Sequence, residues 1–169
     1  MVIASDIILK GTVWKKAAET FSPIFKERLH YDVFLLSTSI GVAYDKRKET
    51  LDDNSGADIS IPRNVFNGRS DPFDTLFQSA ILTTTTEELE DEARLKIAFA
   101  ADDETDGFNR IQFLTQFANF GVEKLLELDG LDDIDSMEKL LNFVIATAEG
   151  HNFEITDLDD DAIAEALDQ

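Results

Sequence analysis

The sequence predicts an all-α protein, a single-domain bundle of six or seven helices spanning residues 1–169. Apolar residues recur every three or four positions along most of the chain, which is the period of an amphipathic helix. The chain is 43% hydrophobic and contains 13 Phe, so it can bury a core of its own. Since no repeat or linker divides the sequence, we expect one domain.

The first two helices are expected at residues 11–31 and 33–44. Trp14 and Phe21 belong to the apolar stripe of the first helix, and Pro23 is expected to bend it because proline removes a backbone hydrogen bond. Asp32 is the expected cap of the second helix. That second helix is apolar nearly all round, which is typical of a helix at the centre of a protein.

Residues 45–70 form the main irregular segment, with one short extended piece expected at Ile59–Ile61. Asp71 and Pro72 then supply a capping carboxylate and a proline at the first helical position. This helix is expected to stop at 83–86. Thr85 and Glu88 have the spacing of a capping box, and they predict the start of the next helix.

The second half of the chain continues the helical pattern. Residues 108–128 form the longest predicted helix, and Gly130 is expected to cap its C-terminus. Asp135 or Ser136 is expected to cap the following helix, which ends at Gly150. The apolar stripe of that helix consists of Met137, Leu140, Leu141, Val144, Ile145 and Ala148. A short final helix is expected from Thr156.

The charge of the chain is very uneven. Its formal net charge is −20, but residues 1–70 carry 10 basic and 9 acidic side chains, whereas residues 71–169 carry 5 and 26. This asymmetry is typical of an interaction role. An acidic surface repels nucleic acid and attracts basic partners, so direct DNA binding is expected to be weak or absent. Asp is more frequent than Glu, 21 to 14, which also suits a protein from a saline host. The acidity therefore has two alternative explanations, an interaction role or adaptation to salt.

The sequence carries no recognisable catalytic or cofactor-binding motif. It has no Cys, which excludes disulfides and thiolate chemistry and fits a cytoplasmic protein, and no apolar run long enough to cross a membrane. His30 and His151 lack the spacing of metal ligands. The acidic loop at 102–107 resembles a calcium loop but has Phe113 where the twelfth, bidentate ligand belongs. We therefore predict no catalytic residue, metal or cofactor.

Two features remain as candidate sites for a protein partner. The first is a set of cations in or beside the irregular segment, which consists of Lys46, Arg47, Lys48, Arg63 and Arg69. Such cations can hold phosphates or an acidic partner, or simply neutralise the acidic half of the chain. The second is the pair Phe113 and Phe120, which either extends the core or forms an apolar patch. Beside Phe120, Asn119 is expected at the surface, and Gly121 is expected to allow close approach of another helix.

Several of these motifs occur in the order found in a known family. They are Asp32-Val33-Phe34, Gly41, Arg47, Ile61-Pro62, Leu95-Lys96-Ile97-Ala98, Phe117-Ala118-Asn119-Phe120-Gly121 and Leu125-Leu126. In these residues the chain resembles the small accessory proteins encoded beside DNA-phosphorothioation (Dnd) systems, over residues 28–128. The resemblance implies a helical accessory protein in bacterial or archaeal defence against foreign DNA. It supplies no catalytic residue.

Three functional hypotheses follow. The first is a non-enzymatic accessory protein that docks a DNA-handling protein through residues 45–70 or through an apolar helix face. The second is an acidic DNA mimic that inhibits a nuclease or DNA-binding protein, with its acids grouped near residues 87–92, 102–106, 129–135 and 157–161. The third is an enzyme with a metal site made of carboxylates, which requires several of these acids to converge in one pocket.

Overall fold

The computed structural model describes residues 4–26, 29–51, 53–68, 70–85, 89–99 and 108–150. Within these residues the prediction of a bundle of six or seven helices is confirmed: seven helices accompany one small sheet. The helices are α1 (Thr12–Phe25), α2 (Leu29–Ala43), α3 (Arg63–Asn67), α4 (Ser70–Thr83), α5 (Asp91–Phe99), α6 (Arg110–Leu126) and α7 (Asp133–Ala148). The strands are β1 (Ile7–Leu9) and β2 (Ile59–Ile61).

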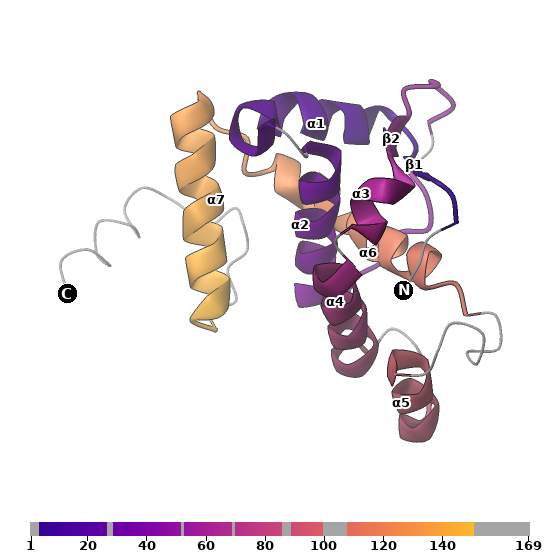
Figure 1. Ribbon diagram of the computed structural model, residues 1–169. Coiled ribbons are helices and arrows are strands. Elements are labelled where there is room, and N and C mark those ends of the chain that lie inside the picture. Colours follow the sequence, from indigo (N-terminus) through magenta and orange to yellow (C-terminus); the bar gives the residue numbers. More distant parts are fainter. Residues whose placement is uncertain are drawn as a thin grey trace.

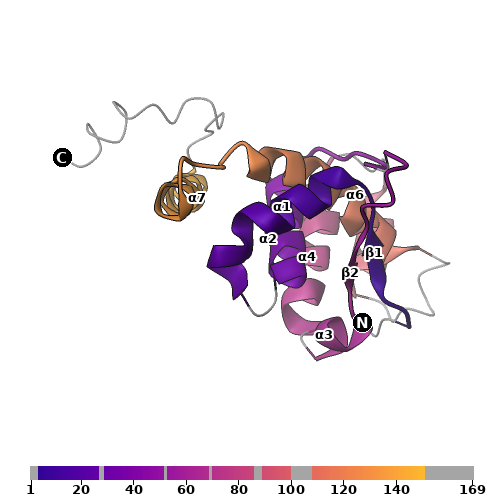
Figure 2. The same ribbon diagram turned by 90° about the horizontal axis from the view of Figure 1, so that it is seen from above.

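The helices surround a central pair formed by α2 and α6 (Figure 1). Helix α1 crosses one end of this pair, and α4 packs beside α2 on the way to α5. Helix α7 stands to one side of the other helices, where it contacts α1. The view from above shows the same arrangement, with α7 seen end-on beyond α1 (Figure 2). The core therefore lies around α2 and α6, and α7 is peripheral.

Two glycines let α2 and α6 approach closely. A Cβ atom built on Gly121 of α6 meets the backbone oxygen of Ser37 at 1.8 Å, and one built on Gly41 of α2 meets that of Phe117 at 2.2 Å. Both distances are far shorter than any real carbon–oxygen contact, so the two backbones touch where side chains normally separate them. The prediction that Gly121 allows close approach of another helix is confirmed.

A small antiparallel sheet ties the N-terminus to the irregular segment. Ile7 pairs with Ile61 and Leu9 with Ile59, so β1 and β2 join parts of the chain that are distant in sequence. The extended piece predicted at residues 59–61 is therefore confirmed, while β1 was not predicted. Ile7 and Leu9 are buried and Ile8 is exposed, but three alternating residues are too few to distinguish a strand from a helix turn.

The boundary between the first two helices was predicted wrongly. Helix α1 ends at Phe25, and Lys26 follows with φ 37°, so the break precedes Leu29 instead of lying at Asp32. Asp32 lies inside the first turn of α2 and is not its cap. Lys26 takes a positive φ, which is outside the helical region, so the first helix ends there instead of running on to Tyr31. Tyr31 consequently belongs to α2, where its buried ring packs against Phe66 at 5.1 Å between centroids.

The capping box predicted at Thr85 does not open α5, because that helix begins only at Asp91. Glu88, its other member, lies outside the described residues. Thr85 instead donates its backbone N–H to a carboxylate oxygen of Asp45 at 2.7 Å, and its hydroxyl donates to the same oxygen. The residue therefore ties the end of α4 to the turn after α2.

The N-terminus of α1 receives its cap from a distant residue. Gly11 precedes the helix and has no side chain, and Asp53 accepts hydrogen bonds from the backbone N–H and the hydroxyl of Thr12, at 3.2 and 2.5 Å. The backbone N–H of Ser55 donates to the other carboxylate oxygen at 3.1 Å. Hydrogen bonds from Ser55 and Thr12 hold the pKa of Asp53 well below its ordinary value.

We expect the Asp53 carboxyl to titrate below its ordinary value of 3.8 when its pKa is measured by NMR. Thr12→Val removes one donor and should move this pKa back toward that value. Because the folded-state pKa is lowered, the stabilisation from these bonds is complete above the unfolded-state pKa and is lost as the pH falls through the folded-state pKa. An Asp53 carboxyl that titrates normally in the unsubstituted protein contradicts this cap.

Candidate interaction surface

The predicted basic residues Lys46, Arg47 and Lys48 lie along α6. The guanidinium of Arg47 stacks over the rings of Phe113 and Phe117, at 5.5 and 5.6 Å from their centroids, and donates to Gln116 at 3.2 Å. Such stacking is a favourable cation–π contact. The segment is thus part of the packing around α6.

Lys48 and Lys46, the neighbours of Arg47, also contact residues of α6. The backbone N–H of Lys48 donates to the carbonyl of Gln116 at 2.9 Å, and its ammonium pairs with Glu123 at 2.6 Å. Lys46 is exposed, and its ammonium lies 5.7 Å from the ring centroid of Phe120. These contacts favour the interpretation that the cations neutralise and pack against the protein's own surface.

The structure brings Phe113 and Phe120 together with this basic segment, but not as an open apolar patch. Phe113 is buried, with its ring against Phe77 and Phe117. Phe120 is half-buried against Tyr44, at 5.8 Å between ring centroids. Phe113 therefore belongs to the core, which is one of the two alternatives that the sequence left open. Phe120 packs at the margin of the core, between Tyr44 and Lys46.

Arg63 is anchored at a different place, and Arg69 lies outside the described residues. The backbone N–H of Arg63 donates to Asp6 at 2.9 Å, and its guanidinium donates to the carbonyl of Ala4 at 3.0 Å. These bonds fix the start of α3 to the segment before β1. The structure therefore does not gather the five predicted cations into one described cluster.

Sequence reasoning misplaced Asn119, which was expected at the surface and is only 5% exposed. Its side-chain oxygen accepts a hydrogen bond from the indole N–H of Trp14 at 3.1 Å. Its amide nitrogen donates to the carbonyls of Lys48 and Glu49, at 3.1 and 3.3 Å. One side chain thus joins α1, α6 and the irregular segment. A buried tryptophan needs an acceptor, which was the signal available in the sequence.

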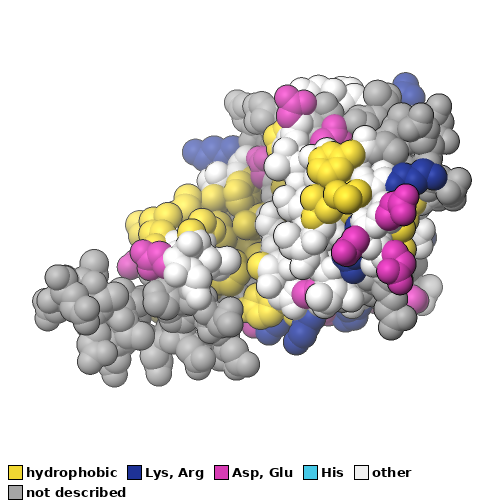
Figure 3. All heavy atoms as spheres, turned by 90° about the horizontal axis from the view of Figure 1, so that it is seen from below, with side chains coloured by type: hydrophobic (Ala, Val, Ile, Leu, Met, Phe, Trp, Pro, Cys, Tyr) yellow, Lys and Arg dark blue, Asp and Glu magenta, His cyan; other side chains and the backbone are white. Residues whose placement is uncertain are grey.

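Among the described residues, exposed apolar side chains are most numerous on and just before α7. Six of the ten large hydrophobic residues exposed in the described part of the chain belong to it. We call this group the α7 face; it consists of Leu131 (99% exposed), Ile134 (78%), Met137 (45%), Leu141 (54%), Val144 (46%) and Ile145 (46%). Hydrophobic side chains accordingly gather over α7 in the view from below (Figure 3). Exposed patches of this kind mark interaction sites.

Helix α7 is apolar on two sides. Its inward side buries Ser136, Leu140, Phe143 and Ala146, while the α7 face points away from the bundle. The predicted stripe of this helix therefore combines residues from both sides: Leu140 is buried, and its neighbour Leu141 is half exposed. An amphipathic surface helix normally turns polar residues outward, so the apolar outer side is unusual.

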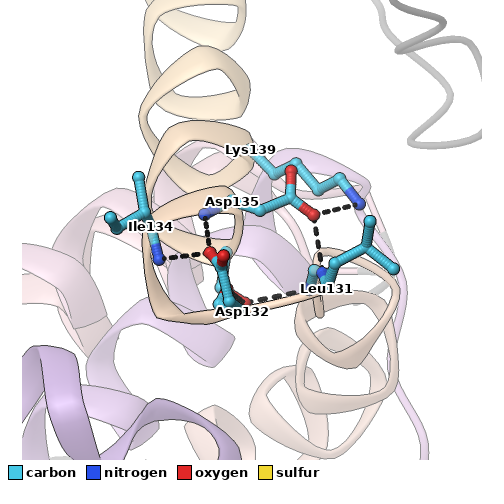
Figure 4. A network of polar contacts seen from close by, with 7 residues as sticks. Leu131, Asp132, Ile134, Asp135 and Lys139 are labelled. Atoms are coloured by element: carbon cyan, nitrogen blue, oxygen red, sulfur yellow. Dashed lines mark hydrogen bonds and ion pairs between the residues drawn. The ribbon is translucent and has the colours of Figure 1, made fainter.

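A network of hydrogen bonds joins the turn before α7 to the first turns of the helix (Figure 4). Asp132 caps the helix by accepting from the backbone N–H groups of Ile134 and Asp135, both at 2.9 Å. Asp135 lies one turn further along, where it accepts from Leu131 at 2.7 Å and pairs with Lys139 at 3.3 Å. The bond from Leu131 lowers the pKa of Asp135. The hydrogen bond from its backbone N–H to Asp135 thus fixes the position of Leu131, whose side chain is exposed.

The predicted caps at this turn were therefore wrong in detail. Helix α7 is capped by Asp132, and Ser136 instead accepts from the backbone N–H of Gly130 at 2.9 Å. Gly130 does not cap α6, which ends at Leu126. A Cβ atom on Gly130 falls 2.6 Å from the backbone nitrogen of Ser136, so the glycine is needed for the tight turn. Gly150 follows α7 with φ 77°, as a terminating glycine does.

The described residues contain no group of three or more His, Asp or Glu that could hold a metal ion. His30 lies in the first turn of α2, and its Nδ1 is 3.0 Å from the carbonyl of Ser60, which makes it a structural contact between α2 and β2. His151, the acidic loop at 102–107 and the helix predicted from Thr156 lie outside the described residues. No helix in the part of the chain described here is long and apolar enough to cross a bilayer.

The fold and surface define an all-α protein that, within its described residues, exposes a group of apolar side chains along one helix. Comparison with protein-family models, with characterised proteins and with solved structures found no match to this chain.

Proposed function

We propose that this chain is a non-enzymatic accessory protein that docks a protein partner through the α7 face. The observation that supports this proposal is the exposure of six large apolar side chains on one helix side, with Leu131 almost fully exposed. Surface hydrophobic side chains are normally scattered singly, whereas these six follow one another on one helix and the turn before it, as one exposed apolar area. Leaving such an area in water is unfavourable, so a partner that covers it gains binding energy.

The contacts favour this face over the irregular segment as the docking site. Arg47 and Lys48 already contact α6 through stacking, a hydrogen bond and an ion pair. A partner that used them would first have to break these contacts. The α7 face has no such cost, because its side chains are already exposed to solvent.

The nature of the partner rests on charge and on the resemblance to accessory proteins of Dnd systems. We propose a DNA-handling protein in the cytoplasm, because such proteins carry the basic surfaces that an acidic chain attracts. DNA mimicry is supported less. In the acidic group at residues 129–135, Asp132 and Asp135 are occupied with backbone N–H groups, whereas a mimic needs carboxylates presented freely like phosphates.

Leu141→Asp is expected to abolish co-purification of the partner from the native host, because it places a charge in the middle of the apolar face. Leu95→Asp on α5 is the matched control, since Leu95 is 53% exposed and Leu141 54%. Both variants should fold, as judged by circular dichroism. A partner that is lost with Leu95→Asp and retained with Leu141→Asp locates the site on α5 and contradicts the proposal.

A further inference from the structure

We propose that the element docking on the α7 face is an amphipathic helix of another protein, lying antiparallel to α7 with Lys and Arg flanking the second half of its apolar stripe. This inference rests on the proposed function and specifies the chemistry of the partner. It follows from the shape of the face, from the charges around it and from where along α7 those charges lie.

The shape of the face fits a helix. Ile134, Met137, Leu141, Val144 and Ile145 follow one another at helical spacing along a single side of α7. At 1.5 Å per residue, a helix of 16 residues is about 24 Å long, which gives another helix of three or four turns a straight apolar seam. Helices recognise such seams through anchors spaced three, four and seven residues apart.

The charges beside the face are acidic. Glu138 and Glu149 follow one border of the stripe, and Asp133 lies on the other. Lys139 is the basic residue of α7, but it lies toward the turn and pairs with Asp135. A partner helix with Lys or Arg beside its apolar stripe therefore complements this rim, whereas an acidic one is repelled.

The distribution of acids along α7 sets the direction of the partner. Asp129, Asp132, Asp133 and Glu138 lie at or before the first turns, whereas residues 140–148 carry no charge. At the other end of the described helix Glu149 is a single acid, so the negative charge is concentrated at the start of α7. In an antiparallel pair, the last turns of the partner helix lie beside these acids. Basic residues there are also favoured by the partner's own helix dipole, which is negative at its C-terminus.

A second copy of this chain fits less well. Two copies bring together two acidic rims and two chains of net charge −20, so their apolar contact is opposed by mutual repulsion. Screening by salt weakens that repulsion, while it also weakens attraction to a basic partner. Added salt should therefore strengthen binding of a second copy of this chain and weaken binding of a basic partner helix, so the salt dependence distinguishes the two.

Three synthetic peptides of about 18 residues test the inference on the full chain. All three share one leucine stripe on an alanine helix. The first peptide has four lysines beside the stripe in its last two turns, and the second has the same four lysines in its first two turns. The third has glutamates in place of the lysines of the first peptide. Binding is measured by fluorescence anisotropy. We expect the first peptide to bind at least about 5-fold more tightly than the second, and the third not to bind.

Leu141→Asp should weaken binding of the first peptide at least about 10-fold, although it adds negative charge, and Leu95→Asp should leave it unchanged. Raising the salt concentration should weaken binding. The inference is overturned if the lysine peptides bind equally, if the glutamate peptide binds as well, or if Leu141→Asp binds like the unsubstituted chain. It is also overturned if sedimentation equilibrium shows a dimer that salt strengthens and Leu141→Asp dissociates.

The proposed function has a separate readout. A photo-crosslinker in place of Leu141, used in the native host, identifies the docked protein and the crosslinked segment. A DNA-handling protein crosslinked through a segment without basic flanks leaves the proposed function standing and overturns the inference. Co-purification that does not depend on Leu141 contradicts the proposed function itself.

Discussion

Gly121→Ala is expected to destabilise the protein by about 3 kcal/mol or more, although alanine is the better helix former. The new Cβ atom falls 1.8 Å from the backbone oxygen of Ser37 and 2.9 Å from the backbone nitrogen of Gly41. Neither atom can rotate away as a side chain does, so α2 and α6 must move apart and open the core between them. Urea denaturation followed by circular dichroism measures the loss.

Ser39→Ala is the matched control, because Ser39 lies between Ser37 and Gly41 in the sequence but on the exposed side of α2, away from the crossing. Its hydroxyl donates locally, to the carbonyl of Leu35. This change should alter the free energy of unfolding by less than about 0.5 kcal/mol. Gly121→Ala as stable as the unsubstituted protein would show that the two helices do not meet at this point.

The helices themselves could be predicted because each carries its own local signals. The stripe of α6 and the proline near the start of α4 depend on near neighbours in sequence, and a helix lies at each of them. Helix α4 begins at Ser70, however, so Asp71 lies inside its first turn, and the prediction that Asp71 caps the helix was wrong. Gly121 was also informative, because a glycine inside a helix is costly unless a backbone packs against it. Local periodicity and composition therefore sufficed for the bundle.

The candidate surface could not be predicted in the same way, because apolar spacing defines a helix but not what covers it. Leu140 and Leu141 are adjacent members of one predicted stripe, yet α7 buries the first and exposes the second. The difference arises because α7 contacts α1 with one side and leaves the other uncovered. That arrangement depends on contacts between residues more than a hundred positions apart.

The cations illustrate the same limit. Lys46, Arg47 and Lys48 are a conspicuous run in an acidic chain, and the sequence could not tell a docking site from internal neutralisation. Their contacts with α6 are set by the turn after α2, where Asp45 adopts a positive φ of 48° and the backbone of Lys48 joins Gln116. Charge composition alone contains no information on this tertiary geometry.

Asn119→Asp is expected to destabilise the protein strongly at neutral pH, by about 3 kcal/mol, although it changes a single atom. The carboxylate still accepts from Trp14, but its second oxygen faces the carbonyls of Lys48 and Glu49, where the amide nitrogen donates in the native protein. Three acceptors then meet without a proton between them, in a site that is 5% exposed.

The effect of Asn119→Asp should depend on pH, and the sign follows from the missing proton. A protonated carboxyl can donate to one of the two carbonyls, so folding raises the pKa of the introduced carboxyl above the unfolded value of about 3.9. The destabilisation relative to the unsubstituted protein therefore grows as the pH rises from that value through the folded-state pKa. Asn119→Ala removes all three hydrogen bonds but titrates nothing, so its destabilisation should stay constant over the same range. Equal pH profiles for the two variants would show that the side chain of residue 119 does not bridge Trp14 and the irregular segment.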